Sequence, residues 1–494
     1  MRQFDTARDA PDTIHAALTA RDTARDVQVE ATVRTILDDV KARGDAAVLD
    51  YTRRFDWPEA TAKEMEVSLD GMETASEAVS DRDRQMLNDA AFNIRDFHER
   101  EKGQLQSWMH ITSRVNATEP GRASFLGQML NPVGRVGVYV PGGKAAYPST
   151  MLMAGIPATV AGCSIIFCTP PDQTGQLNPL LVAAGWELPG RLFKIGGAQA
   201  IAAMAYGTET VPKCDVIVGP GNAYVNTAKK LVYGEVGIDM LAGPSEVAIV
   251  ADEGANPAFV AADLLAQTEH GHDNRGVLFS HSSEMLEKCK NELAAQREAL
   301  SRKEILAVTA NNLVFVKTNS LEESLALSNV FAPEHLELMV REPLAVLPLV
   351  KNAGAVLLGD YTSAPVGDYW AGPSHTLPTA GAARYASPLS VATFMKRTSV
   401  LYYSAQAAQE AAEDVARFAE AEGFDGHAQA ARLRAKPTPR QVAAPPETGG
   451  GGVSEGTDRE GGAASSAPPP LVFTSSSSPL GRTPVSAANK EVGS

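Results

Sequence analysis

The sequence contains little cysteine, and its few cysteines are not spaced as metal ligands or as a disulfide framework. Four occur, at positions 163, 168, 214 and 289. Isolated cysteines of this kind are most often buried free thiols in a reducing compartment, so we expect a cytoplasmic protein. The sequence also lacks any run of about 18 apolar residues that could span a membrane. Its charged start, MRQFDTARDAPD, has no apolar signal segment.

Positive charge is also scarce relative to negative charge. Lys and Arg number 44 against 59 Asp and Glu, which gives a formal net charge of −15. A chain of this sign is poorly suited to the phosphate backbone of nucleic acids. Apolar residues make up 44% of 494 residues, which is enough to bury large cores. At roughly 100–200 residues per domain, we expect two to four domains.

From residue 135 onward, short β-branched runs alternate with helical stretches. This alternation predicts parallel sheets covered by helices on both faces, arranged as two doubly wound, Rossmann-like α/β lobes. Ligands of such sheets bind at the carboxyl ends of the strands. The expected strands are 135–140, 163–168, 191–195, 215–219, 246–252, 276–280, 312–317 and 354–359, and the expected helices are 147–161, 198–205, 222–233, 257–270 and 284–300.

The remaining segments lack the alternation of strands and helices that marks the α/β part. Helical spacing over 32–56 and 82–102 predicts packing helices without a recognisable site. The segment 390–436 is mainly helical and too short for a core of its own, so it must pack on the main body or on a second subunit. The last part is rich in Pro, Gly and Ser and is expected to be disordered. The predicted organisation is an N-terminal helical arm (1–27), a discontinuous first lobe (28–138 and 245–389), a second lobe (139–244), the helical segment 390–436 and the tail 437–494.

Three expected strands end in glycine turns, at 137–144, 193–200 and 216–224. The sequence has neither a G-x-G-x-x-G fingerprint after a strand nor a P-loop, and glycine turns are needed structurally in any α/β protein. A polar or aromatic residue beside each turn favours a nucleotide pocket, in which one aromatic ring and two amides would contact the ligand. These residues are Tyr139, Gln199 and Asn222.

A second group of polar residues surrounds the end of the expected helix 257–270. Gln267 and His270 are three residues apart and share one face of that helix, so they could hold a metal ion if other ligands arrived from elsewhere. A solvated helix end is the plainer alternative. Three more histidines stand near carboxylates in loop-like or helix-end stretches, and each alone is more typical of a structural role. The pairs are Glu334 with His335, Asp368 with His375, and Glu422 with His427.

Taken in order, eight motifs make the chain resemble the histidinol dehydrogenase family over roughly residues 25–435. They are RVGVYVPGG, GGAQAIAAMAYGTE, VGPGNAYVNTAKK, IDMLAGPSEV, LLAQTEHG, APEHLEL, GDYWAGPSHTLPT and EGFDGHAQAARLR. Eight motifs in the family's order and spacing are far more specific than any one of them. The extreme N-terminus and the tail fall outside the resemblance.

The resemblance implies a zinc enzyme of histidine biosynthesis that oxidises L-histidinol to L-histidine through histidinal with two NAD⁺. Glu334 and His335 match the family's acid/base pair. Tyr139, Gln199 and Asn222 match its NAD contacts, which places NAD on the second lobe. The matching zinc ligands are Gln267, His270, Asp368 and His427. The matching substrate contacts are Ser245, Gln267, His270, His335, Asp368, Glu422 and His427, with His375 as a further candidate.

For assembly, the resemblance implies a domain-swapped homodimer in which the segment 390–436 completes the partner's active site. An open site of nitrogen and oxygen ligands could also accept Mn²⁺ or Co²⁺, and the sequence does not choose among the metals. Because no cysteine lies in a matched motif, we expect no thioester intermediate. Two other interpretations stay open: a paralogous NAD-dependent dehydrogenase of another small alcohol, such as a sulfonated diol, and a non-enzymatic metal- or nucleotide-binding module.

Overall fold

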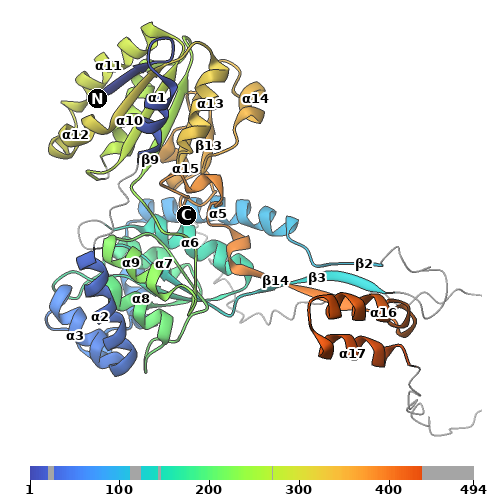
Figure 1. The fold of residues 1–494 in the computed structure, drawn as a ribbon. Helices are drawn as coiled ribbons and strands as arrows, with labels where there is room; N and C mark the ends of the chain where they lie inside the picture. The colour runs from blue at the N-terminus through green and yellow to red at the C-terminus, as the bar shows by residue number, and fades with distance from the viewer. Residues whose placement is uncertain (21–26, 112–123, 143–145, 270, 437–494) are drawn as a thin grey trace, which may run out of the picture. The chain divides into compact units, whose positions relative to one another are not determined.

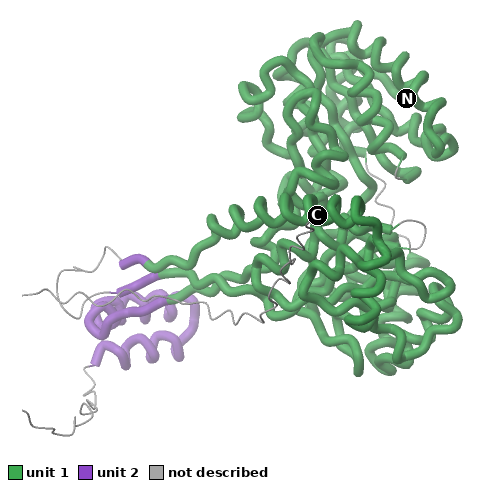
Figure 2. The backbone as a smooth tube through the Cα atoms, turned by 180° about the vertical axis from the view of Figure 1, so that it is seen from behind, with its two compact units in different colours: residues 1–109, 127–400 green, residues 110–126, 401–494 purple. Residues whose placement is uncertain are grey.

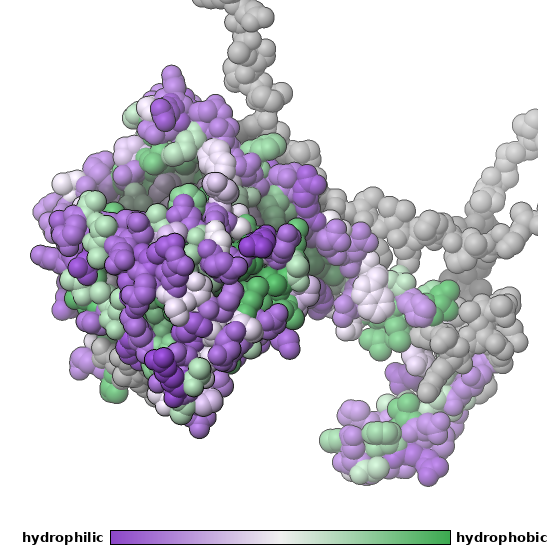
Figure 3. All heavy atoms as spheres, turned by 90° about the horizontal axis from the view of Figure 1, so that it is seen from above, coloured by the Kyte–Doolittle hydropathy of each residue, from purple (hydrophilic) through white to green (hydrophobic). Residues whose placement is uncertain are grey.

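The computed structural model describes residues 1–494 except 21–26, 112–123, 143–145, 270 and 437–494. The predicted tail 437–494 therefore lies outside the described residues. The chain divides into two compact units, residues 1–109 with 127–400, and residues 110–126 with 401–494 (Figure 2). Hydrophilic side chains cover much of the face seen in Figure 3. Within the described residues, no helix combines the length and the apolar character needed to cross a membrane.

The first unit contains a six-stranded parallel sheet in the order β1-β11-β10-β9-β12-β13. Helices α10 and α11 contribute apolar side chains to the core on one face, and α1 and α13 to the core on the other (Figure 1). The strands are β1 (Arg2–Asp5), β9 (Glu246–Ala251), β10 (Arg275–Ser280), β11 (Leu313–Lys317), β12 (His335–Met339) and β13 (Ala355–Leu358); the helices are α1 (Pro11–Thr19), α10 (Pro257–Thr268), α11 (Ser283–Arg297), α12 (Lys303–Thr309), α13 (Leu321–Phe331), α14 (Pro343–Val346) and α15 (Ala364–Tyr369).

The same unit contains a five-stranded parallel sheet in the order β6-β5-β4-β7-β8. One face of it packs against α4, α5, α6 and α7, and the other against α2, α8 and α9, with α3 beside α8 (Figure 1). The strands are β4 (Arg135–Tyr139), β5 (Ser164–Cys168), β6 (Gly190–Phe193), β7 (Val216–Val218) and β8 (Gly237–Ile238); the helices are α2 (Val27–Arg43), α3 (Asp45–Phe55), α4 (Leu69–Glu77), α5 (Asp81–Gln104), α6 (Pro148–Ala161), α7 (Pro179–Trp186), α8 (Gly197–Tyr206) and α9 (Ala223–Val232).

The predicted fold class, two doubly wound α/β lobes, is confirmed, but the assignment of segments to lobes needs correction. Residues 28–138 were placed in the first lobe, whereas α2 to α5 pack on the five-stranded sheet. The apolar stripe of α2, with Val33 and Ile36, finds its partner there. The arm 1–27 is also more than helical, because β1 pairs in parallel with β11. The first error arises because an apolar stripe predicts burial without naming the sheet that covers it, and the second because the four-residue strand β1 is short and polar.

The segment 390–436 is not wholly helical either. After the short 3-10 helix Val391–Phe394 it contains β14 (Met395–Tyr402), which belongs to a three-stranded sheet with β3 (Phe125–Pro132) and β2 (Trp108–Ile111) in the order β14-β3-β2. Helices α16 (Ala405–Ala421) and α17 (Asp425–Arg434) follow and pack on each other in the second unit. Arg432 of α17 forms ion pairs with Glu413 and Glu420 of α16.

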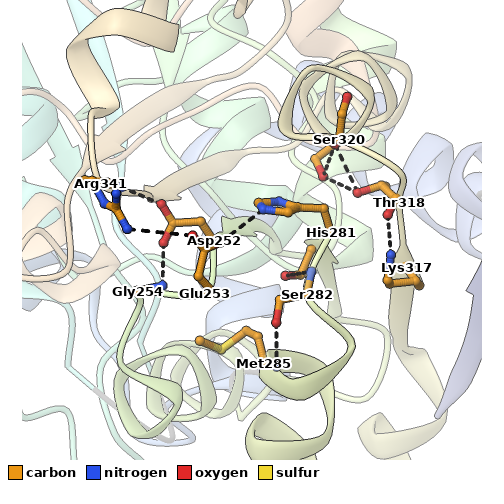
Figure 4. Close-up of polar contacts among 12 residues, drawn as sticks. Asp252, Glu253, Gly254, His281, Ser282, Met285, Lys317, Thr318, Ser320 and Arg341 are labelled. Carbon is orange, nitrogen blue, oxygen red and sulfur yellow. Dashed lines mark hydrogen bonds and ion pairs between the residues drawn. The ribbon is translucent and has the colours of Figure 1, made fainter.

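Both large sheets have the same strand order when their strands are numbered along the chain, 3-2-1-4-5, with β1 added at one edge of the six-stranded sheet. The order reverses between β4 and β7 in one sheet and between β9 and β12 in the other, and such reversal points are the usual ligand crevices. At this position in the six-stranded sheet, polar contacts link the residues that follow the strands (Figure 4). Asp252 accepts hydrogen bonds from the N–H groups of Gly254 and Arg341 at 2.8 and 2.7 Å, and Glu253 pairs with His281.

In the five-stranded sheet, a buried ion pair organises the turn after β7. Lys229 and Asp239 pair with side chains that are 0% and 1% exposed. Lys229 Nζ donates to the carbonyl of Gly219 at 2.8 Å, and the N–H of Gly219 donates to Asp239 at 2.9 Å. Gly219 has φ of +110°, and a Cβ there would lie 2.1 Å from the carbonyl oxygen of Tyr139. Only glycine at position 219 therefore allows the turn to approach β4 this closely. Lys229 and Asp239 fix the turn by bonding to the carbonyl and the N–H of Gly219.

Breaking this pair should destabilise the protein far more than breaking an exposed pair. In Lys229→Met, Asp239 stays buried without its cation, and we expect a loss of about 3–5 kcal/mol in the free energy of unfolding. The matched control is Lys213→Met, which breaks the exposed pair with Glu235 and should cost less than about 1 kcal/mol. Urea unfolding of both variants and of the unchanged protein measures the free energy of unfolding of each. Equal losses in the two variants would contradict this account of the turn.

Candidate functional site

A cavity of about 660 Å³ lies at the carboxyl edge of the five-stranded sheet. Its volume is in the range of small-molecule and cofactor sites. All three residues predicted to contact a nucleotide line it, because each follows or ends a strand of that sheet or begins the next helix. The lining residues include Thr32, Tyr51, Arg54, Asp56, Tyr139, Gly142, Pro170, Gly197, Gln199, Asn222 and Tyr224.

Hydrogen bonds fix the polar groups around this cavity. Tyr139 Oη accepts the N–H of Gly197 at 3.1 Å, and burial raises the pKa of the phenol, so it stays protonated. Asn222 caps α9 by accepting the N–H groups of Tyr224 and Val225. Gln199 Nε2 donates to Asp56 Oδ2 at 3.3 Å. Tyr139 and Asn222 are thus held by backbone N–H groups of nearby turns and helix starts, and Gln199 is held by Asp56.

Asp56 was missed by the sequence analysis, which gave residues 32–56 no site. It follows α3, lines the cavity and is partly buried. Burial raises its pKa to about 6, and the N–H of Gly196 acts in the opposite direction. Helical periodicity carried no signal for this role, because the residue lies just beyond the helix and reaches the cavity only through the packing of α3 beside α8.

A second polar cluster lies at the amino ends of β9 and β12 in the six-stranded sheet, opposite to the edge that was expected. Ser245 precedes β9, Glu334 precedes β12, and His335 is the first residue of β12. Gln267 lies at the end of α10, which returns to this edge after β9. Glu334 Oε2 accepts the N–H of Glu246 at 3.0 Å and Gln267 Nε2 at 3.2 Å. The expectation of carboxyl-edge ligands holds for the cavity but not for this cluster.

His335 stands between two carboxyl groups. Its Nε2 lies 3.3 Å from Asp368 Oδ1, and its Nδ1 lies 3.9 Å from Glu334 Oε2. The imidazole is 3% exposed, and Nδ1 has no hydrogen-bond partner within the described residues. Burial lowers the pKa of His335, but the hydrogen bond with Asp368 and the charge of Glu334 outweigh it, so the net shift is upward. This environment stabilises a protonated imidazole.

Glu334 is the complementary group. Burial raises its pKa to about 7, while His335 and the N–H of Glu246 act in the opposite direction. A carboxyl group with such a pKa exchanges protons near neutral pH, which is the property of a general base. Asn274 links two residues of the cluster. Its Nδ2 donates to the carbonyl of Gln267, and its Oδ1 accepts the N–H of Ser245, both at 3.1 Å. Sequence analysis did not select Asn274.

Comparison with known proteins identifies the family that carries this cluster. The sequence profile described as histidinol dehydrogenase matches residues 19–435. The histidinol dehydrogenase of Geobacter sulfurreducens is 44% identical over 439 residues, covering 88% of this chain and 100% of that protein. That of Aquifex aeolicus is 45% identical over 409 residues, covering 82% and 92%. This chain belongs to the histidinol dehydrogenase family.

Solved structures agree with the family assignment. The crystal structure of histidinol dehydrogenase from Elizabethkingia anophelis superposes with a TM-score of 0.80 at 36% identity, covering 88% of this chain and 98% of that one. The histidinol dehydrogenase fold thus accounts for nearly all of the part outside the tail. The resemblance identified from the eight sequence motifs is confirmed.

The remaining predicted residues of the family site are distributed as follows. His375 is partly buried, and burial lowers its pKa although Asp368 acts against this. His270 lies outside the described residues. Glu422 and His427 are exposed residues of the second unit, in and beside α16 and α17. Among the described side chains, no three of the His, Cys, Asp and Glu types gather as a metal site. Within the first unit, the predicted ligands still described are Asp368 and an amide, Gln267.

Proposed function

We propose that this member of the histidinol dehydrogenase family oxidises L-histidinol to L-histidine through histidinal, with NAD⁺ as the hydride acceptor and a bound zinc ion. The observation that carries the proposal is the arrangement of buried Glu334 and His335 with partly buried Asp368, beside Gln267. It supplies two proton-transferring groups of different chemistry next to two oxygen ligands. The oxidation of an alcohol to an acid needs both kinds of group, because it removes two hydrides and adds one water.

The residues fit a divalent cation. Gln267 uses its Nε2 to donate to Glu334, so its carbonyl Oε1 is the atom left for a metal. Asp368 contacts His335 through Oδ1, which leaves Oδ2. His270 and His427 would complete the set with imidazole nitrogen, a ligand that zinc accepts together with oxygen. Mn²⁺ or Co²⁺ would suit the same ligands. When bound, the cation would orient the amine and imidazole of the substrate and fix its carbinol carbon.

In the first oxidation we assign the base to His335. Its Nδ1 is buried and free of hydrogen bonds within the described residues, so it can accept the proton of the substrate hydroxyl as hydride leaves for NAD⁺. Asp368, on the other ring nitrogen, stabilises the resulting imidazolium. The hydride acceptor would lie in the cavity with Tyr139, Gln199 and Asn222.

In the second oxidation we assign the base to Glu334. With a pKa of about 7, its carboxyl group is ionised in a substantial fraction of molecules at neutral pH. It can then take a proton from the water that adds to the aldehyde. The aldehyde oxygen takes up a proton as the water adds, and the hydrate formed in this way loses the second hydride together with one hydroxyl proton as the carboxyl group forms. No cysteine thiolate is needed, and the four cysteines are buried.

We further propose that the site is completed by a second copy of the chain. The second unit carries Glu422 and His427 on its surface, where they are accessible to a partner. Glu422 would bind the substrate's amine or imidazole, and Ser245 and His375 would contact the substrate from the first unit. Exposed apolar side chains on the same unit, including Val415, Phe418 and Phe424, are of the kind that subunit interfaces bury.

The stoichiometry of the reaction tests the proposed function. We expect two NADH per L-histidinol consumed, because both oxidations occur on one enzyme, and we expect a chelator to abolish the reaction and zinc to restore it. Absorbance of NADH measures both. A single NADH per substrate, insensitivity to chelation, or faster turnover of another small alcohol such as a sulfonated diol would contradict it.

Glu334→Gln should separate the two oxidations. The amide keeps the size of the side chain but cannot accept a proton, so oxidation of histidinal should fall by about 10²–10⁴-fold, the usual contribution of general acid/base catalysis. Oxidation of histidinol to histidinal should fall much less. Rates with each substrate make the measurement, and Glu342→Gln, at an exposed position, is the control. Equal losses in both steps would refute this division of labour.

A further inference from the structure

Two buried acidic residues lie on α10 and β12, the elements that also carry Gln267 and His335, and the mechanism above does not use them. Asp263 of α10 is 7% exposed and Glu337 of β12 is 1% exposed. Each carboxyl group affects the pKa of the other through a side-chain hydrogen bond. The negative charge of Asp368 also raises the pKa of Glu337. Burying two negative charges side by side is costly unless a positive charge pairs with them. The two acids are therefore not expected to be ionised at the same time.

The hydrogen bonds around Glu337 indicate where a proton lies. Glu337 Oε1 accepts the N–H of Ala364 at 3.2 Å. Its Oε2 is buried and accepts no hydrogen bond from any N–H or hydroxyl group of the described residues. An ionised carboxylate can only accept hydrogen bonds, so two carboxyl groups bond to each other only when one carries a proton. Burial, the largest effect on both groups, raises the pKa of Asp263 to about 6 and that of Glu337 well above its usual range.

The pair connects three elements that carry residues of the proposed site. Asp263 lies one helical turn before Gln267 on α10. Glu337 lies two residues after His335, so both side chains point to the same face of β12. The N–H that Glu337 accepts belongs to Ala364, the first residue of α15, and Asp368 follows one turn later on that helix.

We propose that Asp263 and Glu337 share one proton and act as a positioning pair that holds α10, β12 and α15 in register, so that Gln267 and Asp368 are fixed for the metal. The link to the metal rests on the proposed function; the shared proton does not. Neither residue touches the substrate, the cofactor or the metal. They act through the elements that carry those contacts.

Amide variants test the shared proton. In Glu337→Gln, the amide can donate to Asp263 and still accept the N–H of Ala364, and Asp263→Asn can donate to Glu337, so both variants should keep the fold and bind zinc nearly as well as the unchanged protein. Infrared difference spectra of the full chain at pH 7 should show one fewer protonated carboxyl group in each variant. If neither difference spectrum contains that band, both acids are ionised and the shared proton is refuted.

Alanine variants test the positioning role. In Glu337→Ala and Asp263→Ala the link between the elements is lost, and we expect zinc affinity, measured by competition with a chromogenic chelator, to fall roughly 10–100-fold, as for other residues that orient metal ligands. Glu342→Ala, at an exposed position, should leave it unchanged. Unaltered zinc affinity in the folded alanine variants would overturn the role.

The two amide variants keep the test decisive if the alanine variants fail to fold. A loss of zinc affinity in Glu337→Gln and Asp263→Asn larger than about tenfold would also overturn the positioning pair. Failure of the proposed function would appear differently. In that case the unchanged protein itself would bind no zinc or produce no NADH from L-histidinol, while the infrared bands would still report on the shared proton.

Discussion

The proposed site depends on one buried carboxyl group, that of Glu334, and on the two N–H donors that hold it. One donor belongs to the backbone at the start of β9 and the other to the side chain of Gln267 at the end of α10. A buried carboxyl group needs such donors, because burying it unpaired is costly. The two bonds bring a strand, a helix end and the start of β12 together. They also turn the amide of Gln267 so that its oxygen is left for another partner.

The two lobes use the same strand order for different purposes. At the reversal point of the five-stranded sheet, Gly219 lets the turn after β7 lie close to the end of β4. A cavity lies beside Tyr139 at this edge of the sheet. At the equivalent position of the six-stranded sheet, Asp252 accepts hydrogen bonds from the N–H groups of Gly254 and Arg341 and so links the chain after β9 to the chain after β12. The polar residues of that lobe gather instead at the amino edge, where Glu334, His335 and Gln267 meet. One architecture thus offers a cavity of cofactor size on one lobe and a cluster of titratable groups on the other.

Much of the fold could be predicted from the sequence because its signals are local. Continuous apolar runs predicted all but the shortest or most polar strands of the two sheets, and helices such as α10 began and ended within about two residues of the expected bounds. β12 was missed because its alternating His335 and Glu337 do not resemble a buried strand. These polar groups are buried only because α10 and α15 supply partners from distant parts of the chain.

The site was predictable only where a motif carried it. The eight motifs selected Glu334, His335 and Asp368, which the fold brings together, and Tyr139, Gln199 and Asn222, which line one cavity. Asp56, Asn274 and Asp263 carried no such signal, because each takes its place through contacts between elements far apart in sequence. The same limit applies to the lobe on which α2 to α5 pack.

The most direct test of the account is anomalous diffraction from crystals of the zinc-loaded full-length protein. We expect one zinc peak per chain, with Gln267 Oε1 and Asp368 of one chain and His427 of a second chain at about 2.0–2.2 Å. A peak held by other side chains, or a crystal in which no copy brings His427 near Asp368, would contradict the account.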